Sequence, residues 1–189
     1  MKITIVWLAA IIHCYAIIAP VFADDSIPHI AHSDYFYRCL FGLLAHDVGG
    51  LWSGTRKEDG LDINAEMVFS RPVFAILSGD VRPNAGISLN TRGDTSKIYA
   101  GAIWEIETTS RFFFNTGIGL ALHNGELDTS NTDRKSLGTR ILLRIPFELG
   151  FQLTKHHSLS LMFDHISNAY LASENEGMDT LGLRYGYRF

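Results

Sequence analysis

Beyond its first two dozen residues, the chain lacks any apolar run approaching the roughly 20 residues that a membrane-spanning helix requires. Any membrane span in the remaining chain must therefore be built from β-strands. The chain also lacks a basic run, and its formal net charge is −4. This modest acidity argues against a nucleic acid partner.

Cysteine is nearly absent. Cys14 lies in the apolar N-terminal stretch, which leaves Cys39 alone in the rest of the chain and excludes an internal disulfide there. Cys14 also lacks the small-residue context of a lipoprotein acylation site. We interpret Cys39 as a small buried hydrophobic residue rather than a catalytic thiol.

The N-terminal stretch has the pattern of a secretory signal. Lys2 is followed by a long apolar segment and then by Val21-Phe22-Ala23, which places small residues at the cleavage positions. We expect residues 1–23 to be a signal peptide rather than a retained anchor, and residues 24–189 to form a single outer-membrane β-barrel domain. Loss of Lys2 makes the remaining chain one charge more negative.

After a lead-in without clear periodicity, apolar and polar residues alternate with period two, in segments separated by turn-forming residues. About eight strands are expected, near residues 39–48, 60–69, 84–91, 96–107, 111–123, 138–154, 159–167 and 179–189. Eight is the strand number at which side chains just fill a closed barrel, and hydrocarbon tolerates no open sheet edge. The pattern predicts an all-β fold, an eight-stranded antiparallel transmembrane β-barrel of the outer membrane.

The same alternation predicts a charged barrel interior. The side chains that point inward by parity are Asp62, Glu66, Glu105, Glu107, Glu148, Arg144, Arg184 and Arg188. We interpret them as a structural network of ion pairs rather than a catalytic site. His46 and His123 also point inward, and we expect hydrogen-bonded structural histidines there rather than metal ligands. The C-terminal segment LRYGYRF ends on Phe189, as outer-membrane barrels commonly do.

One group of polar residues shares the outward parity. His165 and Ser167 continue the row of Leu159, Leu161 and Phe163, while Asp179 begins the row that runs to Phe189. With both termini on the periplasmic side, the three residues converge near the outer leaflet. A neighbouring antiparallel strand places a cross-strand residue roughly 5 Å away, so His165 can lie between Ser167 and Asp179.

A His, a Ser and an acid in this order point to ester hydrolysis. A serine hydroxyl needs a base to accept its proton, and a carboxylate holds that base in the required tautomer. These roles assign the nucleophile to Ser167, the base to His165 and the acid to Asp179. Asn168 is a candidate donor to the oxyanion. The His-x-Ser pattern alone is also compatible with a polar pair at the membrane interface.

Most of the chain after the predicted signal peptide resembles a known family, and the C-terminal motif is the most specific part of the resemblance. The segments DHISNA (164–169), NEGMD (175–179) and LGLRYGYRF (181–189) are similar to the C-terminal motif of the lipid A 3-O-deacylases, also called acyloxyacyl hydrolases. GLLAHDVGG and INAEMVF are similar to the broader family. The resemblance implies an eight-stranded outer-membrane barrel that releases the ester-linked 3-hydroxyacyl chain at position 3 of lipid A, without a metal or other cofactor, at a lipid-facing site formed by His165, Ser167 and Asp179.

One position departs from that family. Its better-known members carry Glu as the acid, whereas this chain has the shorter Asp179. Either Asp179 fills the role, which its parity and spacing favour, or Glu176 or Glu174 in the preceding loop supplies the carboxylate. If none of them reaches His165, the protein is a weak or retired enzyme.

The expected partner is lipid A or lipopolysaccharide of the outer leaflet, arriving laterally along the wall formed by Leu161, Phe163, Leu181 and Leu183. The alternatives are a non-catalytic small barrel with a structural, adhesive or lipopolysaccharide-binding role, or another outer-membrane lipid esterase or acyltransferase. Acyl-chain selectivity and the formation of a homodimer stay open.

Overall fold

The computed structural model describes residues 35–189 as one continuous sheet of nine antiparallel strands. The strands are β1 (Phe36–Ala45), β2 (Leu61–Phe69), β3 (Phe74–Ile76), β4 (Gly79–Asn90), β5 (Lys97–Glu107), β6 (Phe112–His123), β7 (Ile141–Gln152), β8 (His157–Ser167) and β9 (Met178–Arg188). The predicted signal peptide, residues 1–23, lies outside the described residues and stays a prediction. Among residues 35–189, no helix is long and apolar enough to cross a membrane.

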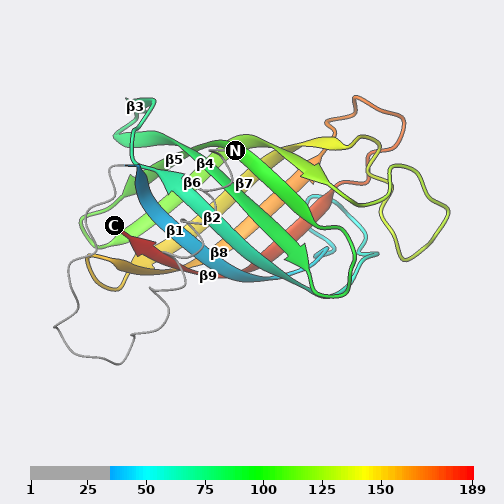
Figure 1. The fold of residues 1–189 in the computed structure, drawn as a ribbon, viewed down its shortest axis with the longest axis horizontal. Coiled ribbons are helices and arrows are strands. Elements are labelled where there is room, and N and C mark those ends of the chain that lie inside the picture. Colours follow the sequence, from blue (N-terminus) through cyan, green and yellow to red (C-terminus); the bar gives the residue numbers. More distant parts are fainter. Residues whose placement is uncertain (1–34) are drawn as a thin grey trace, which may run out of the picture. The chain divides into compact units, whose positions relative to one another are not determined.

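Eight of the strands close into a barrel. β1 pairs with β9 on one side and with β2 on the other, while β2 also pairs with β4, so the ladder returns to its starting strand. Figure 1 shows the strands crossing the barrel at a steep tilt. The predicted fold class is confirmed.

The ninth strand was not predicted. β3 forms a short hairpin with the first residues of β4 and lies at the end of the barrel that carries the C-terminus (Figure 1). β4 consequently begins at Gly79 rather than near residue 84, because its first residues pair with β3 and β5 beyond the point where β2 ends. The predicted strand at 138–154 was too long: β7 begins only at Ile141.

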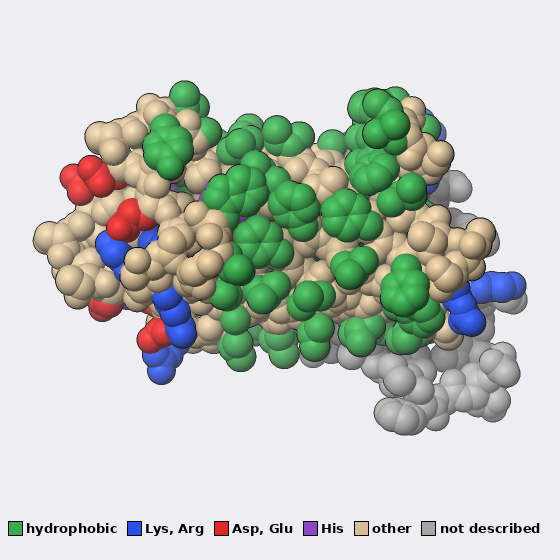
Figure 2. All heavy atoms as spheres, turned by 180° about the vertical axis from the view of Figure 1, so that it is seen from behind, with side chains coloured by type: hydrophobic (Ala, Val, Ile, Leu, Met, Phe, Trp, Pro, Cys, Tyr) green, Lys and Arg blue, Asp and Glu red, His purple; other side chains and the backbone are tan. Residues whose placement is uncertain are grey.

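The predicted outward and inward faces agree with the burial pattern. Leu43, Ile63, Ile98, Leu120 and Leu183 are each about half exposed or more. Their strand neighbours point into the barrel, and those with side chains larger than glycine are buried: Leu44, Asp62, Asn64, Lys97, Tyr99, Ala121 and Arg184. On the face that Figure 2 shows, apolar side chains form a belt across the middle of the barrel, with charged side chains near its two ends. In hydrocarbon, such a belt requires no apolar partner from the protein itself.

The barrel interior holds a network of ion pairs. Glu66 accepts hydrogen bonds from Arg144 (3.2 Å), Arg184 (3.0 Å) and the Tyr99 hydroxyl (3.0 Å). Arg184 also pairs with Glu148 through Nε and Oε1 at 3.1 Å. Because every one of these side chains is buried, each charge requires its partner in place of water.

The network is larger than predicted. Arg144 also pairs with Asp164, which in turn pairs with Lys97, and Arg38 pairs with Glu105. Neither Arg38, Lys97 nor Asp164 was among the predicted interior charges. Glu107 and Arg188 were predicted to lie inside but are partly exposed at the rim, where they pair with each other at 2.7 Å.

We expect Glu66→Gln to destabilise the barrel by about 3–5 kcal/mol, since it leaves two buried guanidinium groups short of a negative charge. Glu107→Gln serves as the matched control and should cost at most about 1 kcal/mol, because its ion pair is exposed to solvent. Urea unfolding of the refolded protein in lipid vesicles measures both values. Equal stability of the two variants would contradict this account of the interior.

Candidate active site

The candidate residues meet where β8 ends and β9 begins. His165 is the direct cross-strand partner of Asp179, and Ser167 follows two residues later on the same face of β8. This pairing provides the cross-strand proximity that the sequence analysis expected of His165 and Asp179. The three side chains therefore come together on two adjacent strands of a continuous hydrogen-bonded ladder.

Two hydrogen bonds connect the three side chains in the order Asp179, His165 and Ser167. Nδ1 of His165 lies 2.6 Å from Oδ1 of Asp179, and Nε2 of the same ring lies 3.0 Å from Oγ of Ser167. The imidazole thus has a carboxylate on one side and a hydroxyl on the other. This is the arrangement in which a base can take a serine proton while a carboxylate stabilises the resulting cation.

A loop residue that sequence reasoning missed covers the imidazole. The ring of Trp52 stacks on His165 with 4.3 Å between centroids and 8° between planes. The backbone N–H groups of Trp52 and Ser53 both donate to Oδ2 of Asp179, at 2.6 and 2.7 Å. We call residues 49–55 the roof segment. The only signal for it in the sequence was a tryptophan among glycines in a loop.

The roof segment changes the predicted exposure of the site. Outward parity implied a lipid-facing site, but only 4% of His165 is exposed and Asp179 is fully buried. The parity is correct; the roof segment covers the outward face at this point. Ser167 stays partly exposed beside a pocket of about 350 Å³. The pocket walls include the roof segment, Lys135, Tyr170 and Gly177.

The other predicted site residues have different partners. The side-chain amide of Asn168 donates to the carbonyl oxygens of Leu137 (3.0 Å) and Glu174, and its backbone N–H donates to Asn175 at 2.9 Å. The proposed oxyanion role of Asn168 is therefore not supported, because its N–H donors are already engaged.

The alternative acids also lie elsewhere. The carboxylate of Glu176 pairs with Lys57 at 2.5 Å and accepts from the backbone N–H of Ser136 at 2.7 Å. Burial alone would raise the pKa of Glu176, but these two partners hold it below its ordinary value. Glu174 contributes a backbone carbonyl to Asn168. Of the candidate carboxylates, Asp179 is the one hydrogen-bonded to His165.

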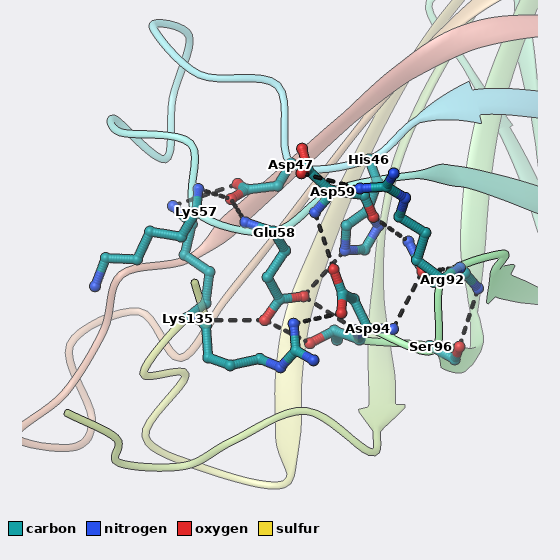
Figure 3. Close-up of polar contacts among 12 residues, drawn as sticks. His46, Asp47, Lys57, Glu58, Asp59, Arg92, Asp94, Ser96 and Lys135 are labelled. Carbon is teal, nitrogen blue, oxygen red and sulfur yellow. Dashed lines mark hydrogen bonds and ion pairs between the residues drawn. The ribbon is translucent and has the colours of Figure 1, made fainter. Parts of the chain in front are cut away.

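The roof segment belongs to a larger group of mouth loops, residues 46–60, 91–96, 124–140 and 168–177, at the barrel end that carries the site (Figure 1). A buried carboxylate joins three of them. Glu58 accepts from the backbone N–H groups of Thr95 (3.0 Å) and Lys135 (3.1 Å), and its Oε2 lies 3.0 Å from Nε2 of His46 (Figure 3).

The predicted interior histidine is thus hydrogen-bonded. Nδ1 of His46 lies 2.7 Å from Asp62. Burial alone would lower the pKa of His46, but its hydrogen bonds to Asp62 and Glu58 raise it to about 9. Burial alone would raise the pKa of Glu58, yet the hydrogen bonds from His46, Lys135 and Thr95 lower it to about 2. His123 hydrogen-bonds the carbonyl oxygen of Thr139 at 2.7 Å.

Lys135 connects the roof segment to Glu58 and Asp47. Its ammonium donates to the carbonyl oxygens of Thr55 (2.6 Å) and Ser53 (3.4 Å) and lies 3.3 Å from Oδ1 of Asp47. Asp47 in turn accepts from the backbone N–H groups of Lys57 and Glu58 (Figure 3). Within residues 35–189, no group of three or more His, Cys, Asp or Glu side chains is arranged to hold a metal ion.

Comparison with known proteins identifies the family of this chain. The sequence model of the lipid A 3-O-deacylase (PagL) family matches residues 84–188, more than half of the chain. The chain belongs to the PagL family. The match includes His165, Ser167 and Asp179 but not the roof segment.

A curated relative supports the same assignment. The lipid A deacylase PagL of Bordetella bronchiseptica is 33% identical over 82 residues, which cover 43% of this chain and 44% of that protein. The chain thus matches less than half the length of this relative.

Three solved structures share the fold. The crystal structure of the outer membrane enzyme PagL has a TM-score of 0.60 at 17% identity and covers 80% of this chain and 99% of its own. Neisserial surface protein A gives a TM-score of 0.52 at 14% identity, over 82% of this chain and 97% of its own. The Yersinia pestis outer membrane protein Ail gives 0.50 at 11% identity, over 82% and 99%. At these identities the likeness extends to the barrel fold alone.

The hydrogen bonds of His46 predict a pH dependence of stability. Its pKa of about 9 lies above the ordinary value of 6.5, so its stabilisation is complete below pH 6.5 and is lost as pH rises through 9. The loss should approach about 3 kcal/mol. The pH dependence that Glu58 contributes has the opposite sign, because its pKa is lowered to about 2. Its contribution to stability is complete above pH 4.5 and is lost on acidification.

Urea unfolding between pH 6 and pH 10 measures this loss. His46→Gln should remove most of the decline above pH 6.5, whereas His156→Gln, at an exposed turn, should retain it. An unchanged decline in His46→Gln would contradict the assignment.

Proposed function

We propose that this protein is an outer-membrane lipid A 3-O-deacylase that uses Ser167 as nucleophile, His165 as base and Asp179 as the orienting acid. Family membership supports the substrate class. The observation that carries the catalytic assignment is the connected chain of Asp179, His165 and Ser167 at 2.6 and 3.0 Å. Residues 1–23 are proposed as the export signal that precedes the barrel domain.

In the first half of the reaction, Oγ of Ser167 attacks the carbonyl carbon of the ester that links a 3-hydroxyacyl chain to lipid A. Nε2 of His165 accepts the hydroxyl proton, and Asp179 stabilises the imidazolium. The tetrahedral intermediate collapses as His165 returns the proton to the departing sugar oxygen. Deacylated lipid A leaves, and the acyl chain stays on Ser167 as an ester.

In the second half, water replaces the sugar alcohol. His165 removes a proton from water, the hydroxyl attacks the acyl-enzyme carbonyl, and the proton returns to Oγ of Ser167. The products are a free 3-hydroxy fatty acid and the original serine. Side chains of this chain supply the nucleophile, the base and the acid for every step.

The position of the site suits a substrate that arrives from the membrane. Below Ser167, the outer wall is apolar: the rings of Phe147 and Phe163 are in contact, and Leu161 is half exposed. Beyond Ser167, toward the mouth loops, the pocket includes Ser53, Thr55 and Asn175. We infer that acyl chains lie along the apolar wall while the polar part of lipid A faces the pocket, with the scissile ester between them.

Ser167→Ala should abolish loss of a 3-hydroxyacyl chain from lipid A, because it removes the hydroxyl that lies 3.0 Å from Nε2 of His165. Mass spectrometry of lipid A from Gram-negative cells that express each protein measures this, with insertion into the outer membrane verified for both. Ser158→Ala, which removes a buried hydroxyl at the far end of β8, is the matched control and should retain activity.

Deacylation by Ser167→Ala at the wild-type rate would refute the assignment of the nucleophile. Unchanged lipid A with correctly inserted wild-type protein would refute the proposed activity itself.

A further inference from the structure

The roof segment does more than cover the site. Both oxygens of Asp179 are hydrogen-bonded, Oδ1 to His165 and Oδ2 to the backbone N–H groups of Trp52 and Ser53. Two N–H donors on one oxygen fix the rotation of the carboxylate, and the stacked Trp52 ring restrains the imidazole from its face. The β1–β2 loop thus determines the orientation of two of the three reacting side chains.

The roof segment depends in turn on Lys135. The Lys135 side chain is 1% exposed, and its ammonium donates to two carbonyl oxygens of the roof segment, those of Ser53 and Thr55. Its own backbone N–H is held by buried Glu58. A lysine from the β6–β7 loop therefore sets the position of a segment whose bonded residues are 80 and 82 positions away in sequence.

We propose that Trp52 and Lys135 are positioning residues of the deacylase, with Lys135 holding the roof segment and the roof segment holding Asp179 and His165. This inference rests on the proposed function. Neither residue takes part in bond making. Because the donors to Asp179 are backbone groups, their position depends on the tether rather than on the identity of residue 53.

The test compares Trp52→Ala and Lys135→Met with wild type, as refolded full-length proteins in mixed micelles with purified lipid A. Both variants should lower kcat by about 10²-fold with KM little changed, the order of loss that about 1 Å of misplacement causes. Trp52→Phe, which keeps a stacking ring, should recover most of the activity. Arg92→Ala, in an exposed ion pair among the mouth loops, is the control and should match wild type.

Double-mutant cycles separate positioning from direct substrate contact. If the two residues act through one segment, Trp52→Ala combined with Lys135→Met should cost little more than either change alone. In an Asp179→Ala background, Lys135→Met should lower kcat less than it does in wild type, because the backbone donors that Lys135 positions have then lost their acceptor. Additive losses, or a rise in KM without a fall in kcat, would overturn the proposal. Heat-modifiable mobility on gels verifies that each variant is folded, and an active Ser167→Ala would refute the proposed function instead.

A separate feature lies at the opposite end of the barrel. Residues 71–78, which include β3, are all exposed, although Val73, Phe74, Ile76 and Leu77 are large apolar residues. Figure 2 shows an apolar group protruding at the upper right edge of the barrel, at this end. In water, a hairpin that exposes four large apolar side chains would be unfavourable.

The turn of this hairpin is strained at its most exposed residue. Leu77 and Ser78 both have positive φ, 52° and 63°, at positions where a two-residue hairpin prefers Asn and Gly. Each such residue costs roughly 1–2 kcal/mol relative to ordinary backbone. The hairpin therefore places Leu77, which is 79% exposed, at its tip despite a conformational cost.

The hairpin is held against the barrel wall. Nε1 of Trp104 donates to the carbonyl oxygen of Ile76 at 2.8 Å, and Phe74 is the cross-strand partner of Val81, which is itself the partner of Trp104. Direct cross-strand partners share a face of the sheet, so Phe74 extends the outward apolar face of β5. Because this face continues into the apolar belt, the medium that surrounds the belt also reaches the hairpin.

We infer that residues 71–78 form a membrane contact in which the hairpin tip enters the acyl chains of the leaflet at the C-terminal end of the barrel. The contact offsets the strain at Leu77 and restrains the depth of the barrel in the bilayer. Lipid is the occupant that the continuity with the belt favours, over a second copy of the chain or a soluble partner.

The test attaches an environment-sensitive fluorophore to a single cysteine at position 77, in a Cys14→Ala and Cys39→Ala background, and reconstitutes the full chain in phosphatidylcholine vesicles. Matched positions are 161, in the belt, and 131, in an exposed mouth loop. The emission at position 77 should be blue-shifted and should be lost with brominated acyl chains, as at position 161. Water-like emission as at position 131, or a blue shift that brominated lipid does not quench and that grows with protein density, would overturn the inference.

Discussion

Closure of the hydrogen-bonded ladder is the constraint on which the rest of the structure depends. Because β1 pairs with both β2 and β9, and β2 also pairs with β4, the eight barrel strands form a closed ladder, and each of their residues is assigned to the inside or the outside by parity alone. The same ladder fixes His165 opposite Asp179. A shift of one residue in the β8–β9 register would turn one of these side chains into the barrel and separate them.

Closure leaves a narrow interior that must be filled with compatible charges. The cations Arg38, Lys97, Arg144 and Arg184 are paired with the carboxylates Glu66, Glu105, Glu148 and Asp164. Toward the mouth, polar burial continues in His46, Glu58 and Lys135, which bind the loops to one another rather than strand to strand. The interior ion pairs therefore stabilise the strands that carry the site, and the mouth loops pack over it. Together they hold His165, Ser167 and Asp179 in place at the ends of β8 and β9.

Much of this could be predicted because alternation is a local property of the sequence. A strand buried on one face and in contact with lipid on the other has a period of two, and the eight barrel strands followed from it, including the outward row that contains His165 and Ser167. Local pattern was less informative at strand ends. Residues 72–77 are all apolar, so β3 had no alternation to reveal it. Glu107 and Arg188 follow the inward parity, but they lie at the end of the barrel, where inward-pointing side chains are already exposed to solvent.

The sequence by itself determined the barrel, its faces, the charged interior and the common face of His165, Ser167 and Asp179, because each follows from side-chain parity along single strands. Only the tertiary structure showed that Asp179, rather than Glu174 or Glu176, is hydrogen-bonded to His165, that Asn168 is engaged by other partners, and that Trp52 covers His165. Those outcomes depend on loops without periodicity, whose positions are set by contacts between residues far apart in the chain. Glu58 and Lys135, 77 residues apart, are the clearest example.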